Sequence, residues 1–436
     1  MKFEKPFLFL SALIACFVIA SGVTTVSKPS NYSESYPVVV CPPTLNGLTS
    51  QISISSRETQ YQRLENRSSK TVPFKALRFP VTKDSLVISA QGTTPLIWQS
   101  KSGSWAGGTL CSGPNSAAWF VGGTANVTSR GRLILINSGL SDSIVDVQSY
   151  TENAKQPIKS VNLKSKSYVQ LSLDSLAPGD KALAVQVTPR SGRVNAFMID
   201  EQGVGLKALG GDFVNSYPNA SKELVIPAIP NQLPKTGQKA SASHTLRILT
   251  PGDVNTTFTL EVLSADGKFV PVGMSSRSIE AGVVSEFSFE PRISASAFAV
   301  RVTSAEPIVA SVSSSVTISR HKDFVWSTAT PPITPMTIAV TGLSPLIAFA
   351  GESISVKVQA KFVNGKNVSA SVKGSDIATW RVPANARSIT IVSSSKGVFA
   401  GALIASTNGY GFIPIVNGSA LTRVEVPNSN IRVLNP

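Results

Sequence analysis

The sequence predicts an all-β protein built from tandem immunoglobulin-like β-sandwich modules that follow an N-terminal membrane or signal helix. Three observations lead to this prediction: short alternating segments from Tyr36 onward, an internal repeat, and an uncharged apolar run near the N-terminus. Hydrophobic residues make up 42% of the 436 residues and charged residues only 15%. This composition excludes a largely disordered chain, and the lack of Glu/Lys-rich heptads excludes a coiled coil.

The N-terminus has the features of an export segment. Lys2 and Lys5 precede residues 6–26, a run of 21 residues without a charged side chain, and about 20 apolar residues are enough to span a bilayer as a helix. Three outcomes fit the run: a retained anchor, cleavage after the small residues 20–22, or lipidation at Cys16. We therefore expect a chain on the extracytoplasmic side of the cell membrane, or a secreted one if the segment is removed.

Beyond Cys16, the chain has two cysteines, Cys41 and Cys111. Exported proteins meet an oxidising compartment, in which such a pair normally forms a disulfide. No CxxC motif or histidine cluster accompanies the pair, so a zinc site is not expected. We predict a Cys41–Cys111 disulfide, which would close a loop of about 70 residues and stabilise the fold by roughly 4 kcal/mol.

An internal repeat organises the exported part of the chain. Residues 133–139 match residues 246–252, and residues 183–188 match residues 298–303, with an offset of 113–115 residues. A third, shorter copy lies in residues 354–400. Each copy alternates apolar and polar residues with the period of a strand. Six or seven strands in such a unit fit an immunoglobulin-like sandwich. A β-propeller or β-solenoid is the alternative, but propeller blades of about 40–50 residues are half as long.

Proline-rich segments mark the domain boundaries, because such spacers are semi-rigid. One lies between Pro227 and Pro234 and a second in residues 330–335. The predicted parts are a signal peptide or anchor in residues 1–26, an N-terminal β region joined to the first module in residues 27–127, and sandwich repeats in residues 128–229, 236–329 and 336–436.

Four segments resemble a family of exported, N-terminally anchored actinobacterial envelope proteins that is known only as a domain of unknown function. They are Cys-Ser-Gly-Pro at residues 111–114, Trp-Phe-Val-Gly-Gly at residues 119–123, the strand at residues 133–139 and the hairpin at residues 187–196. The resemblance covers roughly residues 35–330. It implies an envelope location and no known activity.

The residues that catalysis would need are sparse. The two histidines, His244 and His321, are far apart in sequence, and the local pair of His321 with Asp323 is interpreted as a solvated turn. The run Gly210-Gly211-Asp212 is likewise interpreted as a turn, since no GxSxG elbow or phosphate loop is present. Paired carboxylates for a hydrolase need only spatial proximity, so this class ranks last. We expect no enzyme activity, no metal and no cofactor.

Three tryptophans, Trp98, Trp105 and Trp119, lie close together in the sequence. Exposed rings beside polar turns stack on sugars, so Trp98 and Trp105 are the candidate glycan contacts. The favoured interpretation is that these rings fill the core next to the disulfide, as tryptophans of β-sandwiches do.

The formal net charge of +15 fits two interpretations, an anionic partner outside the membrane or charges that keep the strand faces soluble. Nucleic acid is not expected, because the chain is exported.

We predict a non-enzymatic, membrane-tethered envelope protein that acts as scaffold, adhesion or assembly partner, with a glycan-binding module for envelope polysaccharide as the alternative. Its partners would be the membrane and an anionic envelope polymer or another envelope protein. A second basic set lies in residues 155–166. The candidate anionic contacts are Arg57, Arg63, Arg67, Lys70, Lys75, Arg78 and Lys83.

Overall fold

The computed structural model describes residues 32–64, 70–205, 207–232, 244–318 and 321–425. The chain divides into two units, one of residues 1–35 with 421–436 and one of residues 36–420. In the smaller unit, β1 (Tyr32–Ser35) pairs with β33 (Thr422–Glu425) in antiparallel fashion. The larger unit holds the remaining strands.

The prediction of an all-β protein is confirmed. The only helical element in the described residues is a short 3-10 turn, η1 (Leu173–Ser175). These residues include no helix with the length and apolar character of a membrane span. The predicted anchor in residues 6–26, with Cys16, lies outside the described residues.

The larger unit consists of four modules in chain order. We name them module A (residues 36–111), module B (112–216), module C (217–330) and module D (331–420). Module A has two four-stranded sheets, in the orders β2-β7-β4-β5 and β10-β9-β3-β6. Its strands are β2 (Val39–Cys41), β3 (Thr49–Ser53), β4 (Gln60–Arg63), β5 (Val72–Pro73), β6 (Arg78–Val81), β7 (Leu86–Ser89), β8 (Thr93–Thr94), β9 (Leu96–Lys101) and β10 (Trp105–Leu110).

Module B also has two four-stranded sheets, in the orders β11-β16-β13-β14 and β15-β12-β17-β18. Buried aliphatic residues from both sheets, such as Leu133, Val147 and Val185, form one shared core. The strands are β11 (Ala118–Val121), β12 (Arg132–Asn137), β13 (Ser143–Thr151), β14 (Lys159–Leu163), β15 (Ser167–Ser172), β16 (Leu183–Pro189), β17 (Val194–Val204) and β18 (Lys207–Val214).

Module C repeats this topology with one difference. The 22-residue strand β25 occupies the positions that β16 and β17 have in module B. Its first part pairs with β19 and β21, and its second part pairs with β20 and β26. The strands are β19 (Ser221–Pro230), β20 (His244–Leu249), β21 (Thr256–Ser264), β22 (Gly267–Phe269), β23 (Arg277–Ile279), β24 (Ser285–Phe289), β25 (Ala297–Ile318) and β26 (His321–Thr328).

Module D is built on a single sheet in the order β32-β31-β28-β30-β27, which β29 joins beside β28. The sheet continues into module A, because β27 pairs in parallel with β8 through Thr337 and Thr93. The strands are β27 (Met336–Ala339), β28 (Leu346–Phe362), β29 (Asn367–Arg381), β30 (Ala386–Ser394), β31 (Phe399–Ala405) and β32 (Tyr410–Pro414).

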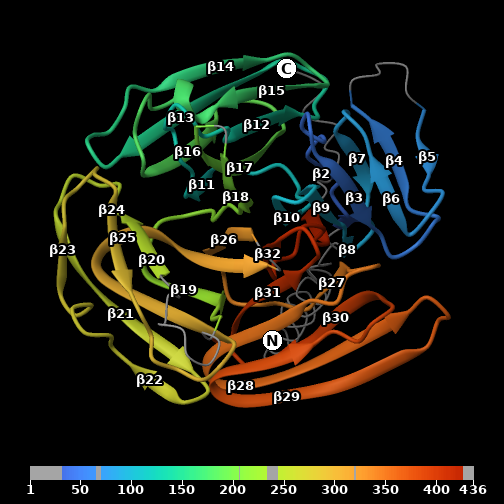
Figure 1. Ribbon diagram of the computed structural model, residues 1–436. Helices are drawn as coiled ribbons and strands as arrows, with labels where there is room; N and C mark the ends of the chain where they lie inside the picture. The colour runs from blue at the N-terminus through green and yellow to red at the C-terminus, as the bar shows by residue number, and fades with distance from the viewer. Residues whose placement is uncertain (1–31, 65–69, 206, 233–243, 319–320, 426–436) are drawn as a thin grey trace, which may run out of the picture. The chain divides into compact units, whose positions relative to one another are not determined.

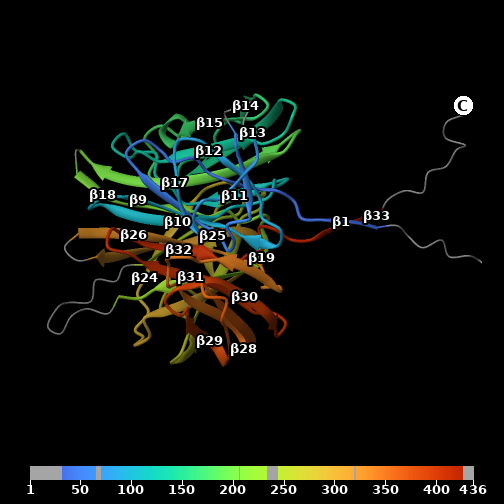
Figure 2. The same ribbon diagram turned by 90° about the vertical axis from the view of Figure 1, so that its right-hand side faces the viewer.

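The four modules close into a ring (Figure 1). Each contributes one strand to the centre, and β10, β18, β26 and β32 contact one another in that order, with β32 returning to β10. Figure 2 shows these central strands as a middle layer, between the outer strands of module B on one side and β28 and β29 on the other. The centre of the ring is therefore the place where all four modules meet.

Alternation along β9 explains how the ring closes. Ile97 faces the core of module A, whereas its neighbours Leu96 and Trp98 lie in the core of module D. Ala106 and Leu110 of β10 lie in the module D core as well. One sheet of module A thus completes two cores, because successive side chains of a strand point to opposite faces.

Candidate functional site

The central strands approach closely because glycines line them. A Cβ atom at Gly107 of β10 would overlap the Asp212 carboxylate, and one at Gly210 of β18 would overlap the Asp323 carboxylate. Gly210 and Gly211 lie inside β18 and Asp212 follows them in the same strand. The interpretation of this run as a turn is therefore wrong: its glycines admit neighbouring strands and their carboxylates.

Asp212 connects modules B and C. The side chain is fully buried. Its Oδ2 accepts a hydrogen bond from the Trp326 amide of β26 at 3.0 Å, and its Oδ1 accepts one from the Phe213 amide at 2.8 Å. A carboxylate thus takes the place of a backbone acceptor between two strands that do not pair with each other.

Asp323 of β26 makes the reciprocal contacts. Its Oδ1 accepts from the Gly211 amide of β18 at 3.1 Å and from the Phe324 amide at 2.9 Å. Its Oδ2 accepts from the Tyr410 amide of β32 at 3.4 Å, which adds module D to the junction. Asp323 is buried within a strand, so the prediction of a solvated turn for this residue is wrong. His321 is half-buried, and its Nε2 lies 3.1 Å from the Asn408 carbonyl oxygen.

Burial sets the protonation of this pair. Desolvation raises the pKa of Asp323 to about 7, although three backbone amides act in the opposite direction. Desolvation also raises the pKa of Asp212 well above its usual range, and the nearby Asp323 charge adds to the rise. Two neighbouring carboxylates resist ionising together, because the charge on one raises the pKa of the other.

A third buried carboxylate, Asp200, lies at the boundary of modules B and C. Its Oδ2 accepts from Trp326 Nε1 at 3.0 Å, and its Oδ1 accepts from the Thr124 amide at 3.1 Å. Desolvation raises the pKa of Asp200, while its hydrogen bonds and the Arg247 charge oppose the rise. The carboxylate therefore fixes the ring of a module C tryptophan inside module B.

Arg247 reinforces the same boundary. This module C side chain is almost fully buried, and its guanidinium carbon lies 4.7 Å from the centre of the Trp326 ring. Its nitrogens donate to the carbonyl oxygens of Gly123 and Leu183 in module B and pair with Glu286 of β24 at 2.8 Å. One arginine thereby satisfies acceptors from two modules.

His244 and Ser314 form a second polar pair inside module C. His244 Nδ1 lies 2.9 Å from Ser314 Oγ, and the ring packs against Phe298. Both residues are fully buried, and burial lowers the histidine pKa to about 4. A neutral, enclosed imidazole cannot meet a substrate from solution, so this pair is a packing feature.

The structure buries the tryptophans predicted as glycan contacts. Trp98 is 6% exposed and lies in the module D core, while Trp105 is fully buried against Ile134 and Phe197 of module B. Trp119 fills the boundary between modules B and C beside Val309. None of the three packs into the cluster that contains the disulfide. The core interpretation fits this burial, but the rings fill boundaries between modules.

The residues of the predicted basic stretch differ in their exposure and in their partners. Arg63 pairs with Asp84 at 3.0 Å, and Arg78 donates to the Thr341 carbonyl oxygen of module D at 2.9 Å. Burial lowers the pKa of Arg78. Arg67 lies outside the described residues. The exposed members of the stretch are Arg57, Lys70, Lys75 and Lys83.

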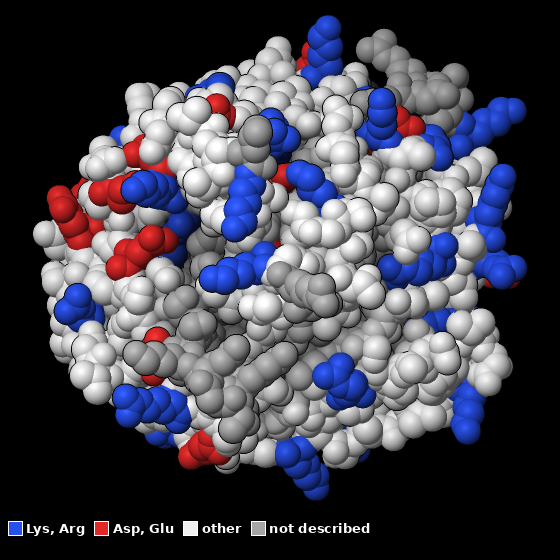
Figure 3. All heavy atoms as spheres, viewed as in Figure 1, with Lys and Arg blue, Asp and Glu red and all other residues white. Residues whose placement is uncertain are grey.

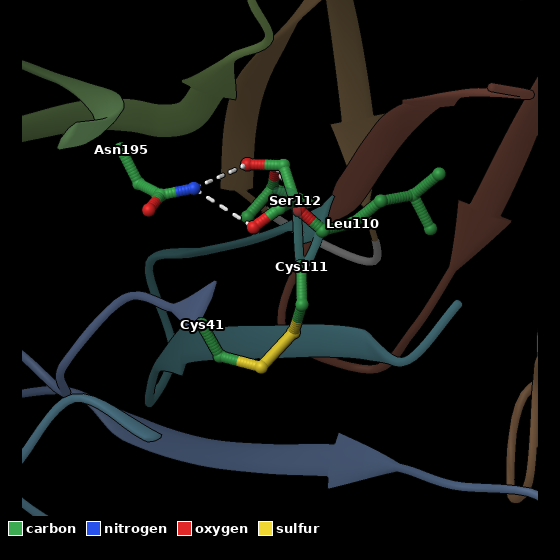
Figure 4. The surroundings of a disulfide bond; sticks show 6 residues. Cys41, Leu110, Cys111, Ser112 and Asn195 are labelled. Atoms are coloured by element: carbon green, nitrogen blue, oxygen red, sulfur yellow. Dashed lines mark hydrogen bonds between the residues drawn. A yellow bond between two sulfur atoms is a disulfide. The ribbon is translucent and has the colours of Figure 1, made fainter. Parts of the chain in front are cut away.

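The predicted disulfide is present between Cys41 and Cys111. It joins β2 to the residue after β10, and both half-cystines are fully buried (Figure 4). The next residue, Ser112, is held by module B, because Asn195 Nδ2 donates to its carbonyl oxygen at 2.8 Å and lies 3.3 Å from its Oγ. The disulfide thus lies where modules A and B join.

Within the described ranges, no cluster of three or more His, Cys, Asp or Glu side chains could hold a metal ion. The central carboxylates use their oxygens on backbone amides of neighbouring strands. This arrangement stabilises strand contacts and leaves little capacity for a ligand. The sequence feature that could have indicated this junction is the run Gly210-Gly211-Asp212 inside an alternating segment.

Comparisons with known proteins supply a family and no activity. No curated protein matches the chain. A solved structure described as Thermotoga maritima 1070 is 16% identical, with 24% of this chain and 94% of that chain covered. Its TM-score of 0.21 is too low to support an argument about the fold. Residues 87–380, more than half of the sequence, match the model described as a family of unknown function (DUF5719), and the chain therefore belongs to this family.

Proposed function

We propose that this chain is a non-enzymatic, membrane-tethered envelope protein that acts on the extracytoplasmic side as a scaffold, adhesion or assembly partner. The observation that carries the proposal is the central junction. Its ionisable groups with the most perturbed pKa values, Asp212 and Asp323, are enclosed and engaged by backbone amides. Perturbed carboxylates often mark active sites, but here they connect strands of different modules.

The extracytoplasmic location is supported by two features. The Cys41–Cys111 disulfide is typical of oxidising compartments. The apolar residues 6–26 after Lys2 and Lys5 are typical of an export segment. We infer from both that the ring stands outside the membrane, held by its N-terminus or released from it.

Protease added to intact cells tests the location. We expect degradation of a C-terminally tagged full chain without lysis, and a shift on non-reducing gels after reduction and alkylation. A tag that is protected until lysis, together with free thiols at both cysteines, would contradict the proposed location.

A conservative double substitution tests the absence of catalysis. Asp212→Asn with Asp323→Asn keeps one acceptor oxygen at each position and removes both ionisable groups. A scaffold predicts that this variant complements a deletion strain as well as the natural chain does, at equal protein level. Loss of complementation with the ring still folded by near-ultraviolet circular dichroism would instead indicate that these carboxylates take part in chemistry.

We infer that modules B and C are tandem immunoglobulin-like sandwiches, because each places two sets of four or more strands around one apolar core. An experimental structure in which these sheets do not pack face to face would overturn this assignment.

A further inference from the structure

Three turns of module B converge at one end of the module. The Ser138 amide donates to the Arg193 carbonyl oxygen at 3.2 Å, and the Lys166 amide donates to the Gly139 carbonyl oxygen at 3.3 Å. These bonds bring together the turns that follow β12, β14 and β16. We call this surface the module B tip. It comprises residues 138–144, 164–166 and 190–193.

The module B tip is basic. Within the described part of the chain, Lys164, Lys166 and Arg193 form no ion pair. Arg190 pairs with Asp146. The surface extends to exposed Lys83 of module A, whose carbonyl oxygen accepts a hydrogen bond from the Tyr168 hydroxyl at 3.1 Å.

Apolar side chains stand among these cations. Leu140 is 84% exposed and Ile144 is 45% exposed. Asp142, the acidic residue between them, accepts the Ser165 amide with its Oδ1 at 2.8 Å. Exposed apolar side chains in the same group of turns as Lys164, Lys166 and Arg193 give the surface the character of an amphipathic membrane contact.

The corresponding turns of module C carry the opposite charge. The turn between β20 and β21 contains Asp253 and Val254, and Val254 is 60% exposed. Glu280 follows β23, and Glu306 lies in the middle of β25, where module B has a turn. Figure 3 shows acidic side chains gathered on the left of the visible face, whereas Lys and Arg are spread over the rest. The repeat thus presents one basic end and one acidic end on the same topology.

We propose that the module B tip binds the surface of an anionic lipid bilayer, with Leu140 and Ile144 in the headgroup region and the cations on lipid phosphates. A hydrated acidic polymer would use the cations but offers nothing to exposed Leu140. A bilayer satisfies both, since its interface accepts apolar side chains and its surface potential attracts Lys and Arg. The proposal does not depend on the scaffold role.

A fluorescent label at position 140 tests the contact in the full chain. The probe is the dye NBD on Leu140→Cys in a Cys16→Ser background, mixed with vesicles of phosphatidylcholine alone or with phosphatidylglycerol. We expect a blue-shifted, brighter emission only with phosphatidylglycerol. The same label on Val254→Cys is the matched control and stays in water. The local readout separates the tip from insertion of residues 6–26.

Removal of two lysine charges from the module B tip provides the second test. Lys164→Gln with Lys166→Gln lowers the equilibrium constant for tip contact about 25-fold, at about fivefold per cation. Lys357→Gln with Lys373→Gln, on exposed strand positions of module D, removes the same charge and leaves the contact unchanged.

Three results would overturn the proposal. One is an unchanged emission at position 140 with both vesicles, and another is an equal response at position 254. In the third, the label at position 140 stays in water with both vesicles, and the natural chain binds polygalacturonate whereas the variant with Lys164→Gln and Lys166→Gln does not. That last result would assign the tip to an acidic polymer instead.

Discussion

At the scale of residues, three buried carboxylates with raised pKa values lie where modules meet. Asp200, Asp212 and Asp323 each accept hydrogen bonds from a strand of a neighbouring module. A buried carboxylate is costly unless it is protonated or well hydrogen-bonded. The stability of the ring is therefore linked to pH through these three side chains.

We predict that Asp323 makes the fold more stable in mild acid. Its folded pKa of about 7 lies above the unfolded value of 3.8, so the native state binds the proton more tightly. This contribution is complete below about pH 4 and is lost as pH rises toward and through 7. The free energy of unfolding falls by about 2–3 kcal/mol between pH 5 and pH 8 through this group.

Urea unfolding of the natural chain and of Asp323→Asn at several pH values measures this contribution. The difference between the two curves isolates Asp323 from other titrating groups. Asp146→Asn serves as the control outside the central junction, because the Arg190 hydrogen bond holds the pKa of Asp146 below its usual range and gives the opposite sign. Parallel pH curves for the natural chain and Asp323→Asn would show that Asp323 is not the linked group.

At the scale of elements, glycine spacing decides which strands can reach the centre. Gly107 lies on β10 next to the Asp212 carboxylate and to the Phe213 amide of β18. Here the glycine serves close approach, since no left-handed backbone is needed at this position. Any side chain would push β10 away from β18.

Gly107→Ala is expected to lower the free energy of unfolding by about 1–3 kcal/mol, as overpacking of a close contact does. Gly252→Ala, in an open turn with nothing within 4 Å of its Cβ position, is the control and changes stability by less than about 0.5 kcal/mol. Chemical denaturation of both variants provides the comparison. Equal stability of the two would mean that β10 has room to move.

The disulfide also connects strands that are far apart in the sequence. It closes a 70-residue separation and joins the first strand of module A to the end of β10. Cys41→Ala with Cys111→Ala is expected to cost about 4 kcal/mol in the chain-entropy model. Calorimetry of the oxidised chain, the reduced chain and the variant measures it. Reduction that leaves the melting temperature unchanged would contradict this expectation.

Strand content and the disulfide could be predicted from sequence, but the partners of each face could not. The consecutive apolar residues Leu96, Ile97 and Trp98 indicate a strand but do not show that Ile97 packs in module A and its neighbours in module D. The central carboxylates were missed for a related reason. Gly210-Gly211-Asp212 has the composition of a turn, and only the approach of β10 and β26 shows why the glycines lie within a strand.

At the scale of the whole molecule, shared cores make the four modules interdependent. Trp98 belongs to module A by sequence and to module D by packing, and β8 pairs with β27. Arg247 and Trp326 connect modules B and C in the same way. Independent folding units would instead be separated by linkers with few contacts.

We predict a single cooperative unfolding transition for the ring. Trp98→Ala should lower its stability by about 3–5 kcal/mol, the usual cost of truncating a buried large aromatic residue, and should leave the transition single. Calorimetry, together with circular dichroism and tryptophan fluorescence, checks whether all probes coincide. Separate melting of one module in the natural chain would show that the modules fold independently.

The sharing of one sheet between two cores has a consequence for biosynthesis. Leu96, Trp98, Ala106 and Leu110 are made early, but the module D strands that cover them begin only at β27. The 225 residues from 111 to 335 separate the end of β10 from that strand, and their synthesis at ~5–20 residues per second takes on the order of 10–45 s. During that interval the nascent chain exposes this apolar face, and we expect a holding chaperone to cover it until the C-terminal quarter has been made.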